Sequence, residues 1–190
     1  MAWGAAQGGD WGNQRHRANA LALEAGYQPK NVKLKPWFRV GYFKSSGDDN
    51  NLDGKHETFF QMLPTPRIYA RTPFYNLMNN EDLFAQVLLR PNPKTNIRLD
   101  YHKVKLSEKN DLYYSGGGAF QHDSFGYAGR PSFGKDGLAD IFDVSFDRQI
   151  NARATLSLYL GFAKGKGVIS EIYKDKDTAR FGFVELTQKF

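Results

Sequence analysis

Arginine recurs on the polar sides of several segments in which apolar and polar residues alternate. A guanidinium group is always charged, and its planar fork matches a carboxylate in a two-point contact. A surface lined with such groups would attract a polyanion, and several weak contacts would keep the polymer moving. The candidate binding residues placed in this way are Arg39, Arg90, Arg98, His102 and Arg153.

Acidic residues fall on the same polar sides, which leaves a second interpretation open. The arginines would then pair with these acids and only stabilise the fold. Such pairs are expected wherever strands enclose a polar interior, as in a β-barrel. The spacing alone does not separate binding from stabilisation. The acids concerned are Glu24, Asp100, Asp143, Asp147 and Glu185.

The segment 45–80 adds two more basic candidates. It is too long and too aromatic for a solvated connector, and such loops often fold inward. Arg67 and Arg71 would then extend the basic lining.

The start of that segment is partly similar to a calcium-binding loop. Asp49, Asn51 and Asp53 precede Gly54, but position twelve is Phe60 instead of the required glutamate. A turn rich in Asp and Asn is therefore the preferred interpretation.

Enzymatic chemistry is the alternative from another class. His102, Asp100 and a serine would make a hydrolase of the barrel type, but the first two are simply neighbours on one strand face, and no GxSxG motif is present. The run Gly116–Gly118 lacks the Lys-Ser/Thr of a P-loop. We expect a chain that is not an enzyme and that has no cofactor.

No metal site is expected either, because no HExxH motif and no i, i+4 pair occurs among His16, His56, His102 and His122.

Composition narrows the classes further. The 190 residues contain no cysteine, which removes disulfides, thiolate zinc sites and thiol catalysis. A net charge of +6 favours an anionic partner without choosing one. The chain is rich in glycine (19) and aromatic residues (15 Phe, 10 Tyr, 3 Trp), a mixture typical of β-structure with long loops. No apolar run approaches the roughly 18 residues of a membrane-spanning helix.

The elements that must position these residues are strands. Period-two alternation is clearest in 152–162, where Leu156, Leu158 and Leu160 share one side, and no helical period competes with it. In 95–106 the phase slips after His102, which suggests a bulge. About seven strands are predicted, at 21–28, 38–43, 83–90, 95–106, 138–147, 152–162 and 179–190.

The connections between these strands alternate between short and long. This pattern is typical of an outer-membrane barrel, with tight periplasmic turns and long outer loops, whereas a soluble β-sheet binding module has no reason for it. Phe190 would then lie in the periplasm, and the segment before residue 21 would be an outer loop. Aromatic residues at the inner strand ends would form an interfacial girdle, namely Tyr27, Trp37, Phe146 and Phe190.

Seven antiparallel strands cannot close, because the first and last would run in the same direction. Open edges are costly in hydrocarbon. The opening MAWGAAQGGDWGN also lacks the basic and apolar regions of a secretion signal. We therefore expect residues 1–190 to be a single domain, the C-terminal part of a larger barrel with an odd number of strands upstream.

Long segments of the chain resemble the bacterial alginate export family. They include WGAAQGGDWGNQRHRANALALEAGYQP, DLYYSGGGAFQ, FGYAGRPS and the closing FVELTQKF. The resemblance covers nearly the whole chain and the C-terminal portion of the family. It implies an all-β, antiparallel transmembrane β-barrel of about eighteen strands in the bacterial outer membrane.

The resemblance also implies a function. Family members pass a polyuronate such as alginate through an arginine-rich constriction, to which Arg130 would belong along with the arginines named above. The expected partners are an anionic polysaccharide, outer-membrane lipid and, through Phe190, the barrel assembly machinery, with no nucleic acid. A general outer-membrane porin for small anionic solutes is the alternative, and a barrel enzyme acting on envelope lipid or polymer is less favoured.

Overall fold

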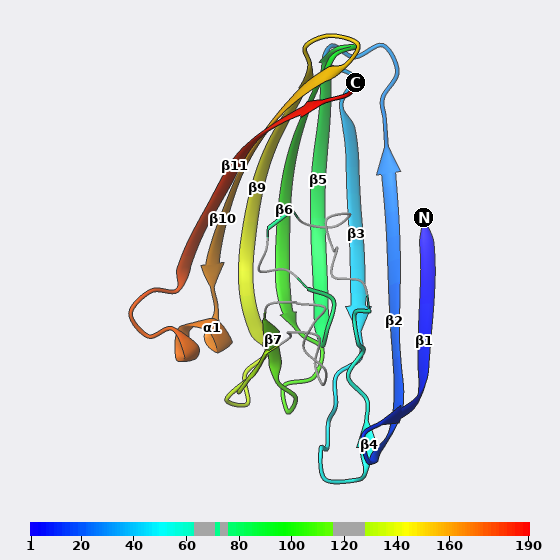
Figure 1. Ribbon diagram of the computed structural model, residues 1–190, viewed down its shortest axis with the longest axis vertical. Helices are drawn as coiled ribbons and strands as arrows, with labels where there is room; N and C mark the ends of the chain where they lie inside the picture. Colours follow the sequence, from blue (N-terminus) through cyan, green and yellow to red (C-terminus); the bar gives the residue numbers. More distant parts are fainter. Residues whose placement is uncertain (63–70, 73–75, 116–127) are drawn as a thin grey trace.

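The chain folds into one antiparallel sheet in which each long strand pairs with its neighbours along the sequence (Figure 1). The computed structural model describes residues 1–62, 71–72, 76–115 and 128–190. Eight long strands follow one another in sheet order, and the two-residue strand β4 (Lys55–His56) adds to β2 in parallel. The long strands are β1 (Ala2–Trp11), β2 (Gln14–Tyr27), β3 (Trp37–Ser45), β5 (Asn80–Asn92), β6 (Thr95–Leu106), β9 (Gly137–Gln149), β10 (Ala154–Gly165) and β11 (Thr178–Gln188).

The N-terminal segment corrects the sequence prediction. Residues expected to form an outer loop are β1 and the first half of β2, joined by a hairpin turn at Gly12 with φ +59°. Alanine and glycine dominate this hairpin, so it carries little hydrophobic alternation and the pattern missed it. The described sheet thus has eight long strands, and the odd count behind the expected upstream strands was wrong.

The two faces of the sheet differ in chemistry as the alternation predicts. On β10, Leu158 and Leu160 are 38% and 69% exposed on one side, while Tyr159 is buried on the other. Cross-strand pairs continue this outer face, since Leu160 pairs with Val144, which pairs with Leu99. The result is an apolar outer belt that runs from Leu23 on β2 to Leu186 on β11. The opposite side is called the inner face.

The expected bulge after His102 is absent from the pairing of β6 with β5, which runs without a break from Ile97 to Leu106. The only irregularity near it lies on the other side of β6, between Val104 and Lys105. Val104 and Leu106 stay on the inner face and are buried there. The sequence prediction moved Val104 and Leu106 to the other face because they are apolar. At this end of the sheet the interior is itself apolar, so they are buried without a change of face.

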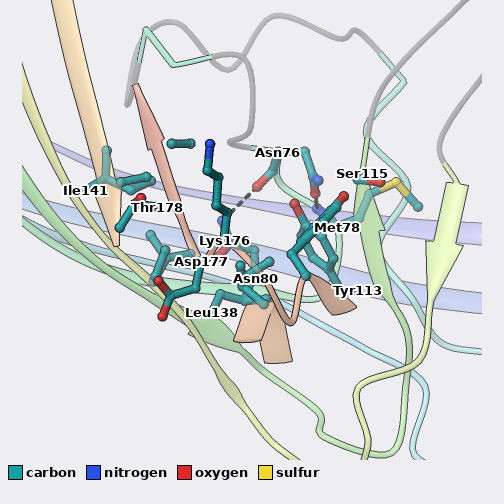
Figure 2. Close-up of a pocket in the computed structure, with 16 residues that line it drawn as sticks. Asn76, Met78, Asn80, Tyr113, Ser115, Leu138, Ile141, Lys176, Asp177 and Thr178 are labelled. Atoms are coloured by element: carbon teal, nitrogen blue, oxygen red, sulfur yellow. Dashed lines mark hydrogen bonds between the residues drawn. The ribbon is translucent and has the colours of Figure 1, made fainter. Parts of the chain in front are cut away.

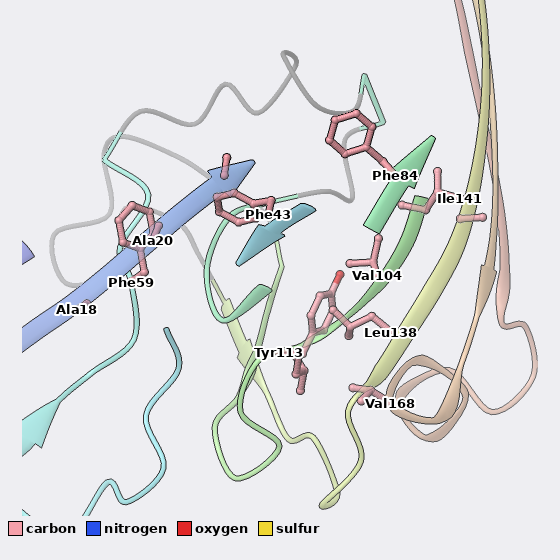
Figure 3. Packing of buried hydrophobic residues seen from close by; sticks show 13 residues of the cluster. Ala18, Ala20, Phe43, Phe59, Phe84, Val104, Tyr113, Leu138, Ile141 and Val168 are labelled. Atoms are coloured by element: carbon pink, nitrogen blue, oxygen red, sulfur yellow. The ribbon is translucent and has the colours of Figure 1, made fainter. Parts of the chain in front are cut away.

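The described parts of the long connections lie at one end of the sheet, together with the Gly12 hairpin (Figure 1). We call the buried cluster beneath them the packed end (Figure 3). Phe43, Leu106 and Val168 are its most buried large members, and Val168 comes from the short helix α1 (Gly167–Ile172). The hairpin β7 (Tyr113–Ser115) and β8 (Ala128–Arg130) also belongs to this end. Within the described residues, no helix has the length and apolar character to cross a bilayer.

Tight turns join the strands at the opposite end. Asn92 accepts a hydrogen bond from the Lys94 amide (3.0 Å), and Asn151 does the same for the Arg153 amide (2.8 Å), as turn-forming side chains do. Phe190 is fully exposed at this end, and Tyr27 is 69% exposed. The interfacial girdle of Tyr27, Trp37, Phe146 and Phe190 stays a prediction.

Candidate functional site

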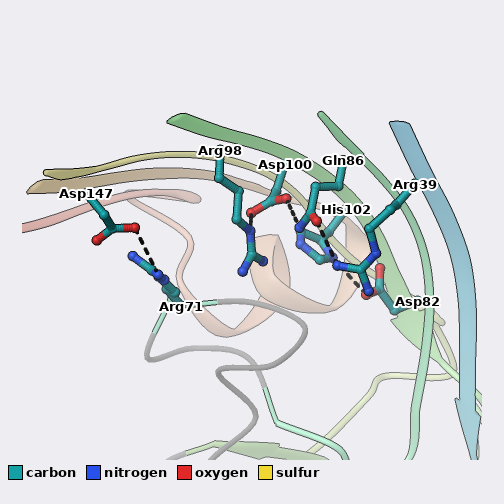
Figure 4. A network of polar contacts seen from close by, with 8 residues as sticks. All are labelled: Arg39, Arg71, Asp82, Gln86, Arg98, Asp100, His102 and Asp147. Carbon is teal, nitrogen blue, oxygen red and sulfur yellow. Dashed lines mark hydrogen bonds and ion pairs between the residues drawn. The ribbon is translucent and has the colours of Figure 1, made fainter. Parts of the chain in front are cut away.

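A chain of polar contacts crosses the inner face from β2 to β6, and Figure 4 shows its part from Arg39 on β3 to Arg98 on β6. The guanidinium of Arg39 forms an ion pair with Glu24 and donates to the Gln86 side-chain oxygen at 2.7 Å. Gln86 in turn donates to Asp100 at 2.6 Å, and Asp100 pairs with Arg98. The sheet register dictates this order, because Arg39 faces Gln86 and Gln86 faces Asp100 on neighbouring strands. We call these five residues the polar ladder.

The two ion pairs of the polar ladder are exposed unequally. The side chains of Arg39 and Arg98 are 18% and 15% exposed, whereas those of Glu24 and Asp100 are 7% and 4% exposed. The cations therefore lie nearer the interior space than the acids that hold them. A ligand carboxylate entering this space would meet guanidinium groups first.

Arg71, which lies between β4 and β5, contacts the inner face. Arg71 contacts Asp147 on β9 at 3.4 Å, and the other oxygen of Asp147 accepts a hydrogen bond from Ser157 at 2.6 Å. Arg71 thus adds a third guanidinium to this face. Arg67 lies outside the described residues.

The remaining predicted arginines lie away from the polar ladder. Arg90 is exposed where the pairing of β5 with β6 shifts register. Arg153 lies in the turn before β10, which begins at Ala154 and not at residue 152. Arg130 is exposed on β8, near the packed end. The structure therefore brings together Arg39, Arg98 and Arg71, with His102 close by, and leaves the other three at the periphery.

His102 is fully buried, and its partner was missed from the sequence. Its Nδ1 lies 2.8 Å from the carboxylate of Asp82, and neither side chain is exposed. The expected strand began at residue 83, one position too late to include Asp82. Gln86, Phe84 and Asp82 are alternate residues on one face of this strand, so starting the predicted strand earlier would have included Asp82. The pairing with Asp82 also means that Asp100 does not orient this imidazole as a hydrolase triad would require.

A cavity of about 520 Å³ lies against the packed end (Figure 2). Its strand walls are apolar, and Asn80, Lys176 and Asp177 add polar or charged groups at its border. The lining is mostly apolar, and Asp177 supplies the charge opposite to that of Lys176, so the cavity does not suit an anionic polymer. The apolar contributions come from Val104, Leu138, Ile141, Ala163 and Ile169.

Asp111 ties two long connections together above the packed end. Its carboxylate accepts hydrogen bonds from the Thr58 hydroxyl at 2.6 Å and the Asp48 amide at 3.0 Å. Burial raises the pKa of Asp111, and these hydrogen bonds counteract part of that rise. Asp111 is therefore structural and does not face the polar ladder.

Side chains of the partial calcium motif serve the local turn. The Asp53 carboxylate accepts a hydrogen bond from the backbone amide of Lys55 at 2.9 Å, and it forms an ion pair with the Lys55 ammonium at 2.6 Å. Asn50 accepts from the Leu52 amide at 3.2 Å. Gly54 follows with φ +78°, which a glycine adopts readily. The preferred interpretation as a turn therefore accounts for these contacts.

Two histidines meet at the corner of β2 and β4. The Nδ1 atoms of His16 and His56 lie 2.9 Å apart, and Trp11 stacks on His56 with 4.4 Å between ring centroids. Burial and the neighbouring His16 lower the pKa of His56 to about 4. His122, the fourth histidine, lies outside the described residues, as does the glycine run Gly116–Gly118.

Comparison with known proteins was made at two levels. Residues 2–171 match the model of a protein family described as alginate export. No curated protein matches the chain. The family match includes every strand of the polar ladder and ends within α1.

Proposed function

Because the chain belongs to the alginate export family, whose members are outer-membrane channels for polysaccharide export, we propose that the inner face of its sheet forms the wall of such a channel. In this proposal the polar ladder contacts an anionic polymer such as alginate. The all-β fold and the outer-membrane, polysaccharide-transport character follow from the family. The assignment of the wall and its residues is our inference.

The contrast between the two faces carries this proposal. A continuous apolar belt covers the outer face, and guanidinium–carboxylate pairs line the inner face at the same depth. An outer-membrane barrel needs this arrangement, with apolar residues towards lipid and polar residues towards water. A soluble β-sheet module would gain nothing from exposing Leu83, Leu160 and Val184 on one surface.

Weak, exchangeable contacts are the mechanism we propose. A polymer carboxylate approaching Arg39 would take the place of Glu24, and the next would replace Asp100 on Arg98. Because Glu24 and Asp100 recover their guanidinium partners once the polymer has moved on, each contact with the polymer is temporary. Salt in a water-filled channel screens these contacts further. The polymer is therefore guided without being held.

Turnover chemistry is not part of the proposal. The alginate export family is a family of transport channels and not of enzymes. The buried pairing of His102 with Asp82 agrees with a structural role for this imidazole.

Ion selectivity in planar bilayers tests the proposed wall. Arg39→Gln combined with Arg98→Gln removes two cations from the inner face and should shift the reversal potential towards lower anion selectivity. Arg180→Gln is the matched control, because Arg180 is exposed on the outer face, opposite Phe162. Unchanged selectivity in the double variant, or an equal shift in the control, would remove these arginines from the pore.

The same recordings separate the two transport alternatives. Oligomers of a polyuronate should block the current transiently if the wall binds the polymer, and the block should weaken in the double variant. A general porin for small anionic solutes would keep its selectivity but show no such block.

Three finer expectations stay predictions. They are a single domain of a larger barrel formed by residues 1–190, a contribution to the lining by Arg67, Arg90, Arg130 and Arg153, and recognition of Phe190 by the assembly machinery. The exposed position of Phe190 at the tight-turn end is compatible with the last of these.

A further inference from the structure

Three potential metal ligands converge on the inner face, where β6 pairs with β9. Asp100 and His102 lie two residues apart on β6, and Asp143 lies on β9 directly opposite Asp100. One ligand atom from each of the three lies within 4.8 Å of the other two, and all three residues are buried. The spacing of the sequence could not reveal this group, because the third ligand comes from a distant strand.

The electrostatics of the group call for a cation. Like charges placed directly opposite each other on neighbouring strands destabilise a sheet, and Asp100 and Asp143 are such a pair. Asp143 is only 1% exposed, and the hydroxyl of Tyr159 is the neutral donor next to its carboxylate. One neutral hydrogen bond offsets only part of the cost of burying a carboxylate.

Nearby cations do not balance this charge. The charged groups that act on Asp143 are His102, Asp100 and Arg98, and Arg98 is already paired with Asp100. Asp82 adds another buried carboxylate behind His102. The region around Asp143 therefore carries more carboxylates than guanidinium groups.

The imidazole of His102 is oriented as a metal ligand would be. A carboxylate oxygen of Asp82 lies 2.8 Å from Nδ1 (Figure 4), and a hydrogen bond that Nδ1 donates to it makes Nε2 the ring nitrogen that would ligate a metal. A carboxylate that fixes the tautomer and orientation of a ligating histidine is the common outer partner at metal sites. Asp82 thus has the position of a supporting residue and not of a ligand.

We propose that Asp100, His102 and Asp143 bind one divalent transition-metal ion of the Zn²⁺ type, which joins β6 to β9 within the wall. One imidazole and two carboxylates form a ligand set that suits Zn²⁺, with bonds of about 2.0–2.2 Å that small side-chain movements would achieve here. The hard cations Ca²⁺ and Mg²⁺ prefer oxygen ligands alone and fit less well. The positive charge of the bound ion would also offset the negative charge of these acids, which would otherwise repel an anionic polymer at this depth. Metal binding does not depend on the proposed channel function.

Metal binding by the purified full chain in detergent is the direct test. After treatment with a chelator and its removal, titration with Zn²⁺ alone should show one tight equivalent, and Co²⁺ should give the visible absorption of a bound ion with low coordination number. Asp143→Asn should abolish this equivalent, and so should His102→Gln. Asp82→Asn should weaken it by about 10–100-fold, the usual effect of removing an outer partner.

Two controls keep the assignment specific. Asp147→Asn removes a carboxylate that lies, like that of Asp143, on the inner face of β9, and it should leave Zn²⁺ binding unchanged. His56→Gln breaks up the pair of His16 and His56, whose Nδ1 atoms lie 2.9 Å apart, and should also retain the tight equivalent. Loss of binding in His56→Gln but not in Asp143→Asn would overturn the proposal.

The unmodified chain provides a measurement that does not depend on any variant folding. Zn²⁺ should raise its Tm, and excess chelator should reverse the rise, because a ligand that binds only the folded state stabilises it. An unchanged Tm together with no tight equivalent would reject the metal site.

Discussion

The two ends of the inner face are built from the same strands but have opposite chemistry. On β6, Val104 and Leu106 belong to the packed end, while Arg98 and Asp100 belong to the polar ladder. Alternation therefore decides which face a residue occupies, and depth along the strand decides what surrounds it there. A single hydrophobic pattern cannot report both.

The covering segments explain the difference. Long connections and α1 lie over the packed end, so its inward side chains are removed from water. Towards the tight turns, inward side chains instead pair guanidinium with carboxylate across strands. Each region is stable by its own means, the first by apolar burial and the second by matched charges.

The largest expected effect comes from cutting a cavity into the packed end. Phe43 is fully buried, and Phe43→Ala should lower the free energy of unfolding by about 3–5 kcal/mol. Urea unfolding followed by tryptophan fluorescence would measure this, since Trp3 lies 5.9 Å from the Phe43 ring. Phe133→Ala is the control, because Phe133 is 55% exposed. A loss as small as that of the control would mean that this end is not packed.

The next effect concerns the outer face, which the two regions share. Leu160→Arg should cost about 2–4 kcal/mol in lipid if Leu160 lies near the middle of the bilayer. Leu52→Arg is matched in chemistry but lies 90% exposed in a connection, and it should change little. Unfolding of both variants in lipid vesicles decides the point. Equal behaviour would contradict a lipid-facing belt.

A smaller loss is expected in the polar ladder. Arg39→Gln leaves Glu24 without its cation and should lower the free energy of unfolding by about 1–3 kcal/mol, the usual range for a buried acceptor that loses its donor. Chemical denaturation beside Arg180→Gln measures it. A loss as large as that of Phe43→Ala would erase the distinction between the two regions.

The smallest effect is a dependence on pH at the corner of β2 and β4. The pKa of His56 is about 4 in the folded chain and 6.5 for the free group, so the unfolded state binds more protons between these values. Stability should therefore fall as the pH drops from about 6.5 to about 4. Partial exposure limits the change to the order of 1 kcal/mol. The difference in Tm between wild type and His56→Gln over this range isolates it, and a constant difference would contradict the shift.

Most of the fold was predictable because alternation is a local property. The strands at 83–90 and 152–162 were recognised from a few consecutive residues each, and their faces were assigned correctly. β1 was not recognised, since Ala and Gly give no contrast between its two faces. After His102 the pairing with β9 shifts register between Val104 and Lys105, but no side chain changes face, because Val104 and Leu106 are apolar residues on the inner face.

The candidate site was less predictable, because contacts across strands depend on register. The sequence named Arg39, Arg98, His102 and Arg71, and the structure gives each an acidic partner. It could not show that Asp82 supports His102, nor that Arg153 falls in a turn. Charge pairing on the inner face, the interpretation left open at first, is present in the structure and is compatible with transport.

The meander has a consequence for how the sheet can be assembled. Within the described residues, each long strand pairs with the long strands before and after it in the chain, so each addition of a long strand closes a loop no longer than one connection. The entropic cost of closure grows slowly with loop length, and contacts between sequence neighbours favour rapid formation. The wall can therefore grow hairpin by hairpin, with each new edge serving as the template for the next strand.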